Sequence, residues 1–490
     1  DKRNRAGRAR IGCGKRADAR PVFARAPTAM WVPRAVDPSP ARLAAARRDA
    51  APTQGSPSTA PRIYHRPVAI ARFLYTIGMY LLTPVILYRL AMRGLRYREY
   101  FARWQERFGF FAAPGIEGSI WVHAVSVGEV NAALPLIEAL MRRFEGMPFV
   151  ITTVTPTGSA RVRQLFGDRV FHVYLPYDLP ASVKRFLDRV RPRIAVVMET
   201  EIWPNLFRGC RKRRIPVVVA NARLSERSLR GYGPVRPLAR EAIRSAAHVA
   251  AQSQQDAQRF LRLGADASRM TVVGNVKYDL RIPPGLEQSG TMLREYWGRT
   301  RPVWIAASTR EGEEAPVIEA HMRVLKRFPD ALLLLAPRHP ERFRPAAQLC
   351  RQYGFRTLTR SDDTVATAET QCFVVDTLGE LLTFYAACDV AFVAGSFDPI
   401  GGHNVLEPAA LGKPVLTGPH TFNFAEITDS LIAGAAALRV ADGVALGDAV
   451  VRLLGDAALR EAMGAAARHR VESERGAVAR IVEIAAQHLH

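Results

Sequence analysis

The segment from Gly395 to Pro419 reads GSFDPIGGHNVLEPAALGKPVLTGP, and it decides the fold. It begins after an apolar run, Val390–Ala394, that predicts a buried strand, and its adjacent glycines, Gly401–Gly402, predict a tight turn. A helical pattern, Leu406–Leu411, follows and stops before the next apolar run. A strand, a glycine turn and a helix start in this order direct free backbone N–H groups toward an anion such as phosphate.

A carboxylate stands at the start of that predicted helix. Glu407 lies one helical turn after His403, and we expect it to face solvent and to accept hydrogen bonds from two ribose hydroxyls. Two glycines before a helix are by themselves more often an ordinary strand–helix turn. The longer pattern H-N-x-L-E-P-x-x-x-G-x-P is more specific. It resembles the donor-nucleotide motif of GT-B glycosyltransferases, an α/β architecture with two facing Rossmann-like domains.

Apolar runs alternate with helical patterns through the rest of the chain, which predicts two doubly wound domains of parallel strands. The predicted strands are Ile120–Val125, Phe149–Val154, Ile194–Met198, Val217–Ala220, Met270–Val273, Val303–Ala307, Ala331–Ala336, Phe373–Val375, Asp389–Ala394 and Pro414–Thr417. A polar segment near Leu280–Gly290 is the predicted linker. We therefore expect one domain at residues 99–285 and a second at 286–490, whose last helix packs back on the first. The resemblance to GT-B glycosyltransferases implies that the first domain binds the acceptor and the second binds the donor.

The charge of the chain is unevenly distributed. Its 490 residues carry a net charge of +24, and the sequence pI is near 10.6, as in many nucleic-acid-binding proteins. Residues 1–72, however, hold 16 lysines and arginines against four aspartates, which is half of the excess. A folded basic face is therefore not indicated, and we expect no nucleic-acid partner. The five cysteines have no paired spacing, which favours a reducing compartment and argues against a zinc site or a disulfide framework.

The N-terminal part of the chain predicts a tail and a membrane anchor. Residues 1–66 are rich in Arg, Ala and Pro, so we expect a basic, disordered extension. Phe73–Tyr88 is uncharged and apolar, within a predicted anchor or interfacial helix at residues 67–98. The arginines that follow it, starting at Arg89, favour the cytoplasmic face of a membrane and its anionic head groups. A buried core helix is the alternative interpretation.

Charged residues follow the predicted strands of the first domain, where ligands of parallel sheets bind. Glu129 opens a helix after Ile120–Val125 and suits a general base, although a carboxylate at a helix start is more often a cap. Glu199 and Glu201 both follow Ile194–Met198. Lys277 follows Met270–Val273 and suits a counter-charge for an anionic donor, with an ordinary surface lysine as the alternative.

Strand ends of the second domain are polar as well. Arg338 follows Ala331–Ala336 and is a natural phosphate or base contact. Asp376–Glu380 opens another predicted helix, whose N–H groups suit a donor anion. Each of these signals is weak alone, but all lie on the same predicted edge of the sheets.

Long blocks of the chain resemble one family, the 3-deoxy-D-manno-octulosonic acid (Kdo) transferases of lipopolysaccharide biosynthesis. They are HAVSVGE (123–129), TPTGSARV (155–162), YLPYDLP (174–180), METEIWPN (198–205), ANARLSERS (220–228), AASTREGEE (306–314), APRHPERF (336–343), GGHNVLEPAALGKPV (401–415) and GPHTFNFAEI (418–427). The resemblance runs from about Phe73 to the C-terminus. The chain departs from the family at Arg310, where His is frequent, and at Leu378, where Met is usual.

The resemblance implies an inverting transfer of Kdo from CMP-Kdo to a lipid A precursor at the inner membrane. It implies that Glu129 is the proton acceptor and that Glu199 and Lys277 stabilise the transition state. The implied CMP-binding residues are Pro337, Arg338, Leu378, Gly379, Glu380, Asn404, Val405, Leu406 and Glu407. No cofactor and no metal are expected. The resemblance does not imply how many Kdo units are added.

Three other classes of protein remain as alternatives. A GT-B enzyme with a UDP-sugar donor would keep the helix of Glu407 without METEIWPN or an anchor. A nucleotide-sugar epimerase of the same fold would have no lipid acceptor. A basic nucleic-acid-binding protein would carry its charge on a folded face.

Overall fold

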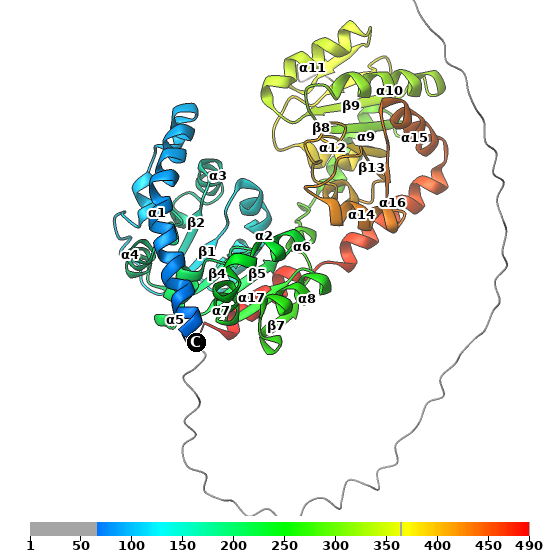
Figure 1. Ribbon diagram of the computed structural model, residues 1–490. Helices are drawn as coiled ribbons and strands as arrows, with labels where there is room; N and C mark the ends of the chain where they lie inside the picture. The colour runs from blue at the N-terminus through cyan, green and yellow to red at the C-terminus, as the bar shows by residue number, and fades with distance from the viewer. Residues whose placement is uncertain (1–65, 363–364, 490) are drawn as a thin grey trace, which may run out of the picture. The chain divides into compact units, whose positions relative to one another are not determined.

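The strands form two parallel sheets of seven strands each (Figure 1). The computed structural model describes residues 66–362 and 365–489. The order of the first sheet is β3-β2-β1-β4-β5-β6-β7, and that of the second is β10-β11-β9-β8-β12-β13-β14. The strands are β1 (Ser119–His123), β2 (Phe149–Thr153), β3 (Phe171–Tyr174), β4 (Pro192–Met198), β5 (Val217–Ala222), β6 (His248–Ala251), β7 (Met270–Val272), β8 (Val303–Thr309), β9 (Leu332–Pro337), β10 (Thr357–Thr359), β11 (Cys372–Val374), β12 (Val390–Val393), β13 (Val415–Thr417) and β14 (Ala437–Arg439).

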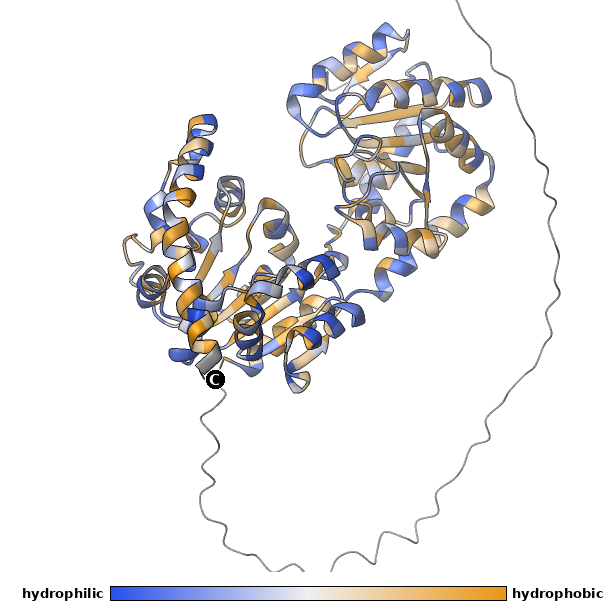
Figure 2. Ribbon diagram, viewed as in Figure 1, coloured by the Kyte–Doolittle hydropathy of each residue, from blue (hydrophilic) through white to orange (hydrophobic). Residues whose placement is uncertain are grey.

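Helices cover both faces of each sheet, which is why the strands are continuous apolar runs. In β9, for example, all six residues of LLLLAP are buried, and strands are orange in Figure 2 where the outer helix faces are blue. The helices are α1 (Arg66–Arg96), α2 (Val127–Arg143), α3 (Pro156–Phe166), α4 (Pro180–Val190), α5 (Pro204–Lys212), α6 (Glu226–Gly231), α7 (Arg236–Arg244), α8 (Gln254–Leu263), α9 (Leu286–Trp297), α10 (Glu314–Arg327), α11 (Pro340–Gln352), α12 (Leu381–Ala387), α13 (Leu406–Ala410), α14 (Ala425–Ala433), α15 (Gly443–Gly455), α16 (Ala457–Ser473) and α17 (Ala477–Gln487).

Each sheet has a point where the direction of strand addition reverses. In the first sheet, β1 has β2 on one side and β4 on the other. In the second sheet, β8 lies between β9 and β12 in the same way. Loops diverge from the carboxyl ends of the strands at such a point and leave room for a ligand. The two places to examine for chemistry are therefore the ends of β1 and β4, and the ends of β8, β9 and β12.

The last helix belongs to the core of the first sheet, although the strands of the second sheet precede it in sequence. Ala477, Ile481 and Ile484 of α17 are buried in one apolar cluster with Ile120 and Val122 of β1. Figure 1 shows α17, in red, beside α2. Asp279, which follows β7, accepts hydrogen bonds from the N–H groups of Gly476 and Val478, at 2.6 Å each, and so caps the start of α17.

Helix α1 contains the apolar segment. Val68–Arg96 is, by length and composition, the one helix among the described residues that is long and apolar enough to cross a membrane. One side of α1 contacts the first sheet's helices and loops, where Arg72 pairs with Glu241 of α7 and Tyr75 donates a hydrogen bond to Asp178 at 3.0 Å. The other side is exposed and apolar, with Phe73, Leu74, Leu81 and Leu82 each at least half exposed.

Several predicted boundaries were wrong. Half of the predicted linker, Leu280–Gly290, is helical, because α9 begins at Leu286. The strand predicted as buried at Met270–Val273 is an edge strand, where Thr271 and Val272 are exposed. β3, β6, β10 and β14 were not predicted, since each is short and carries polar residues such as His172 and His248.

The predicted division into two domains at residues 285 and 286 stays a prediction, as does the anchor at 67–98. The predicted basic extension, residues 1–66, falls outside the described residues except for Arg66, where α1 begins.

Candidate functional site

Three carboxylates gather at the reversal point of the first sheet. Glu129 is the third residue of α2, directly after β1, and Glu199 and Glu201 follow β4. β1 and β4 pair in parallel, with Ile120 opposite Ile194 and His123 opposite Val197, so both strands end at the same edge. The carboxylates of Glu199 and Glu201 both raise the pKa of Glu129, which shows that the three groups lie within electrostatic reach of one another.

Glu129 helps to cap the start of α2, which was the alternative interpretation of its position in the sequence. The side chain of Ser126, the N-cap of α2, accepts the N–H of Glu129 at 3.5 Å, and Oε2 of Glu129 accepts the N–H of Val125 at 2.9 Å. This reciprocal arrangement is close to a capping box. Among the described residues, Oε1 of Glu129 has no hydrogen-bond partner. One oxygen thus holds the helix start, and the other is available to a ligand.

The environment of Glu129 favours proton transfer near neutral pH. Burial raises its pKa to about 7, the hydrogen bond from Val125 opposes this rise, and Glu199 and Glu201 add to it. A general base works best when its pKa is near the working pH, because it is then both ionised and basic. Capping alone does not require a raised pKa, so the role of Glu129 as a general base stays a prediction beside its observed capping contact.

Glu199 adopts a strained backbone conformation. Its φ of 55° lies in the left-handed region, which a residue with a Cβ enters at a cost of roughly 1–3 kcal/mol. Burial raises the pKa of Glu199, and nearby Lys277 and Arg223 oppose the rise. Such strain is common in active sites, where the backbone is held to aim a side chain.

Lys277 lies close enough to Glu199 for each to shift the other. Burial lowers the pKa of Lys277, and the carboxylate of Glu199 counteracts this. The loop that carries Lys277 is held by two asparagines: Oδ1 of Asn275 accepts the N–H of Lys277 at 3.0 Å, and Oδ1 of Asn221 accepts the N–H of Val276 at 3.1 Å. The structure therefore brings the predicted pair together, although their sequence positions are far apart.

Glu201 was not among the residues predicted to act directly, and its partners show a supporting role. Nε1–H of Trp203 donates to Oε2 of Glu201 at 2.7 Å, and Nε2 of the fully buried His123 lies 3.9 Å from the same oxygen. Burial would raise the pKa of Glu201, but His123 and Trp203 outweigh it and lower the pKa. Glu201 therefore stays ionised beside Glu129. The sequence signal that could have identified Glu201 was its motif, METEIWPN.

The predicted nucleotide residue Glu407 lies in a more enclosed place than expected. Its Oε1 accepts a hydrogen bond from Nδ2 of Asn404 at 3.0 Å. Glu407 is only partly exposed, so it is less open to solvent than predicted, and burial raises its pKa against the effects of Asn404 and Arg338. The helix that carries it in its first turn, α13 (Leu406–Ala410), has only five residues and is followed by Gly412 at φ 68°, so the helix dipole adds little there.

The other predicted nucleotide residues come from neighbouring strand ends. Pro337 ends β9, and Arg338 after it is exposed, with its N–H donated to the carbonyl of Thr309 at 2.9 Å. Val405 and Leu406 are each only 1% exposed, so a ligand can reach only their backbone. Leu378 is 71% exposed, Gly379 has φ 91°, and Glu380 pairs with Arg360 at 3.1 Å.

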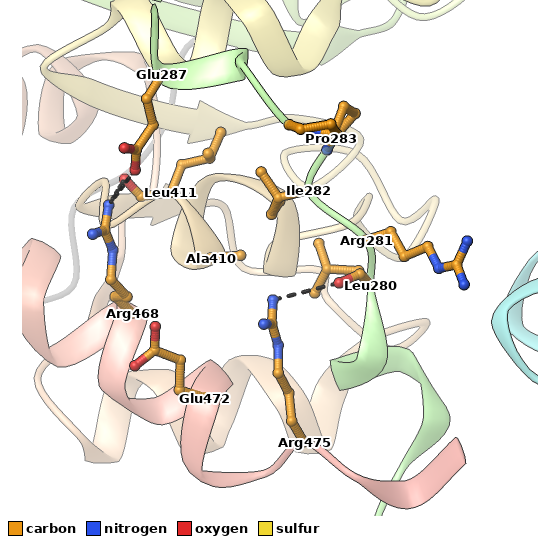
Figure 3. Close-up of a pocket in the computed structure, with 11 residues that line it drawn as sticks. Leu280, Arg281, Ile282, Pro283, Glu287, Ala410, Leu411, Arg468, Glu472 and Arg475 are labelled. Carbon is orange, nitrogen blue, oxygen red and sulfur yellow. Dashed lines mark hydrogen bonds and ion pairs between the residues drawn. The ribbon is translucent and has the colours of Figure 1, made fainter. Parts of the chain in front are cut away.

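Of two cavities that we compare, one touches the carboxylates. The larger, about 630 Å³, is shown in Figure 3. Two of its arginines hold α9 and the segment before it: Arg468 bonds to Glu287 in the first turn of α9 at 3.2 Å, and Arg475 bonds to the carbonyl of Leu280 at 3.4 Å. We assign this cavity to the segment where the chain passes from the strands of the first sheet to those of the second. The second, about 270 Å³, is lined by Glu201 and Trp203 and by Tyr75 of α1.

Potential metal ligands are scattered. No group of three His, Cys, Asp or Glu in residues 66–362 and 365–489 is arranged to hold a metal ion. The four cysteines in this part of the chain are free thiols, and two of them, Cys350 and Cys372, have sulfur atoms 3.4 Å apart.

Comparison with known proteins identifies close relatives. Residues 102–280 match the family model "3-Deoxy-D-manno-octulosonic-acid transferase (kdotransferase)". The chain is similar to the 3-deoxy-D-manno-octulosonic acid transferase of Haemophilus influenzae, with 41% identity over 417 residues, which cover 84% of this chain and 97% of the relative. It is similar to the enzyme of the same name from Bordetella pertussis, with 39% identity, 84% coverage of this chain and 98% of the relative.

A solved structure agrees on the fold. A glycosyltransferase from Rickettsia africae has a TM-score of 0.50 and 14% identity, with 76% of this chain and 99% of that chain covered. Together with the two parallel sheets, this likeness confirms the predicted GT-B fold and carries no information about substrate.

Proposed function

Because the chain belongs to the 3-deoxy-D-manno-octulosonic acid (Kdo) transferase family, we propose that it transfers Kdo from CMP-Kdo to a lipid A precursor, with inversion at the anomeric carbon. The observation that carries this proposal is the carboxylate cluster at the ends of β1 and β4, in which Glu129 has a pKa of about 7. A transferase that inverts needs one base to activate the acceptor hydroxyl, and the cluster supplies a suitable one.

In the proposed reaction, Oε1 of Glu129 accepts the proton of the acceptor hydroxyl. The oxygen then attacks the anomeric carbon of Kdo on the side opposite to the CMP leaving group, and the bond from that carbon to the CMP phosphate breaks. CMP leaves as an anion at neutral pH and needs no proton. Oε2 of Glu129 keeps its hydrogen bond from Val125 throughout, so the base is held in one orientation.

Glu199 and Lys277 have complementary roles in this proposal. Positive charge is expected to develop on the sugar ring as the bond to phosphate lengthens, and an ionised Glu199 stabilises it. Burial raises the pKa of Glu199, and the ammonium group of Lys277 opposes that rise and so favours the ionised form of the carboxyl. The left-handed backbone of Glu199 holds this residue in position before the reaction. A charged group that is already in position stabilises a transition state without first having to move.

Donor recognition is proposed for the second sheet. Glu407, oriented by Asn404, accepts the ribose hydroxyls, and the exposed Arg338 contacts the phosphate. The backbone at Val405, Leu406 and Gly379 supplies N–H groups, because the side chains of the first two are in the core. Leu378 and Glu380 complete the proposed CMP site.

The acceptor is a lipid, and α1 supports a location at the cytoplasmic face of the inner membrane. The exposed side of α1 is apolar, as Leu74 and Leu81 illustrate at 61% and 73% exposure. Arginines 89, 93, 96 and 98 lie at its end, where they suit anionic head groups.

Product analysis tests the proposed function. Purified protein is incubated with CMP-Kdo and a tetraacylated disaccharide precursor of lipid A, and the lipid product is analysed by mass spectrometry. We expect a mass increase of one or more Kdo units, with no increase when a UDP-sugar replaces CMP-Kdo. Transfer from the UDP-sugar, or epimerisation of it without transfer to lipid, would support one of the two related enzyme classes instead.

A further inference from the structure

Two arginines and a histidine gather at the reversal point of the second sheet. Arg310 directly follows β8, Arg338 follows β9, and His403 lies in the glycine turn after β12. The ring of His403 covers Gly395 so closely that a Cβ there would lie 2.5 Å from it. Arg338 and Arg310 both lower the pKa of His403, so all three side chains are near one another.

The acidic side chains beside Arg310 are engaged elsewhere. Glu311 and Glu314 each pair with Arg342, at 3.3 Å. The carboxylate of Glu313 is buried and accepts the N–H groups of Gly395, Ser396 and Phe397 at 2.7, 2.9 and 3.0 Å, besides that of Arg310 at 3.1 Å. Among the described residues, neither Arg310 nor Arg338 forms an ion pair. Arg310 therefore has no paired carboxylate, and Arg338 lies within electrostatic reach of Glu407 without forming an ion pair with it.

Three buried polar atoms at the same strand ends lack hydrogen-bond partners among the described residues. They are Oγ1 of Thr309, Nε of Arg310 and Nε2 of His403. Buried polar groups in folded proteins are nearly always paired, so several orphans in one place indicate that a ligand pairs with them. Burial, together with Arg338, Arg310 and His339, lowers the pKa of His403 to about 4, so its ring is neutral at pH 7 and can donate one hydrogen bond without adding charge.

We propose that Arg310 and His403, beside Thr309, form a subsite for a negatively charged oxygen of the donor, separate from the ribose contact of Glu407. The inference rests on the proposed function and extends it to residues with no role in it so far. The nucleotide sugar acid has two sources of such an oxygen, the phosphate that links sugar to nucleoside and the carboxylate of the sugar. Arginine suits both, because its planar guanidinium donates paired hydrogen bonds to either group.

The test compares three ligands that share cytidine, to which the second adds a phosphate and the third a phosphate with the sugar acid. Dissociation constants of cytidine, CMP and CMP-Kdo are measured by calorimetry, without acceptor, for the wild-type protein, Arg310→Gln and Arg310→Lys. We expect Arg310→Gln to bind CMP-Kdo about 10- to 100-fold more weakly, as for the loss of a charge-assisted hydrogen bond. Arg310→Lys keeps the positive charge, so its affinity for CMP-Kdo should fall less than that of Arg310→Gln. Cytidine has no anion, so its affinity should not change in either variant.

The affinity of Arg310→Gln for CMP shows whether the subsite binds the phosphate or the sugar carboxylate. A weaker affinity of Arg310→Gln for CMP assigns the subsite to the phosphate, and an unchanged affinity for CMP with a weaker one for CMP-Kdo assigns it to the sugar carboxylate. Arg323→Gln is the matched control, since Arg323 pairs with Asp448 on the surface at 3.1 Å and should leave all three constants unchanged.

Two results would overturn the inference. One is an affinity of Arg310→Gln for CMP-Kdo within about twofold of wild type. The other is an equal loss for cytidine, which would show general damage to the site. Because the side chain of Arg310 forms no ion pair among the described residues, thermal unfolding of Arg310→Gln should match wild type and exclude misfolding as the cause. A wild-type protein that forms no Kdo-lipid product would instead contradict the proposed function.

Discussion

The hydroxyl of Tyr75 in α1 donates a hydrogen bond to the carboxylate of Asp178, 3.0 Å away. The same carboxylate accepts the N–H groups of Asn205 and Leu206, at 2.9 and 2.8 Å, and so holds the start of α5. The loop that carries Glu199 and Glu201 ends there. One buried aspartate thus links the apolar helix to the segment that carries two of the three clustered carboxylates.

Loss of the Tyr75 hydroxyl should weaken this link. We expect Tyr75→Phe to lower the free energy of unfolding by about 0.5–1.5 kcal/mol, the usual net worth of one hydrogen bond. Tyr80→Phe, on the exposed side of the same helix, should change nothing. Urea unfolding of Tyr75→Phe, Asp178→Asn and the double variant gives the coupling energy between the two residues. Additive effects would mean that the bond does not contribute to stability.

Glu129→Gln separates catalysis from capping. The glutamine amide oxygen can still accept the N–H of Val125, but it cannot take a proton from the acceptor. Turnover should therefore fall by roughly 10²–10⁴-fold, with CMP affinity and the thermal midpoint nearly unchanged. Glu226→Gln is a matched control, since Glu226 is in the first turn of α6 behind an N-cap serine. Turnover of Glu129→Gln within a few-fold of wild type would leave Glu129 with its capping role alone.

The pH dependence of turnover should show the environment of Glu129. Its raised pKa means that the carboxyl is protonated, and inactive as a base, below about pH 7, so the rate should rise with pH through that value. Glu201→Gln removes one of the negative charges that raise this pKa. The rising limb of the rate profile should then move to lower pH, because ionisation of Glu129 becomes easier. An unmoved limb would show that Glu201 does not act on the base.

Membrane binding should depend on the exposed side of α1. Leu74→Glu together with Leu81→Glu places charges on that side and leaves Arg72 and Tyr75 in contact with the protein. We expect this variant to stay soluble without detergent and to lose flotation with lipid vesicles, while CMP affinity is unchanged. Met322→Glu with Val444→Glu, two exposed apolar residues on α10 and α15, is the control and should float as wild type does. Equal flotation of both variants would locate the membrane contact elsewhere.

Strands that are buried on both faces could be predicted from the sequence, because burial selects an unbroken apolar run, as in Leu332–Leu335 of β9. The position of Glu129 and Glu199 at strand ends followed from the same runs. The contact of His123 with Glu201 could not be predicted, since the two are brought together only by the pairing of β1 with β4. The partial burial of Glu407 could not be predicted either, because it depends on tertiary packing and not on the local sequence pattern.

The capping of α17 by Asp279 has a consequence for biosynthesis. The core of the first sheet includes Ala477, Ile481 and Ile484, so it cannot be completed until α17 has been synthesised. A nascent chain that has emerged as far as β7 exposes the side of α2 that α17 will cover, and it must remain free of aggregation while the whole second sheet is translated. Premature termination anywhere before Ala477 therefore damages the part of the protein that was synthesised first.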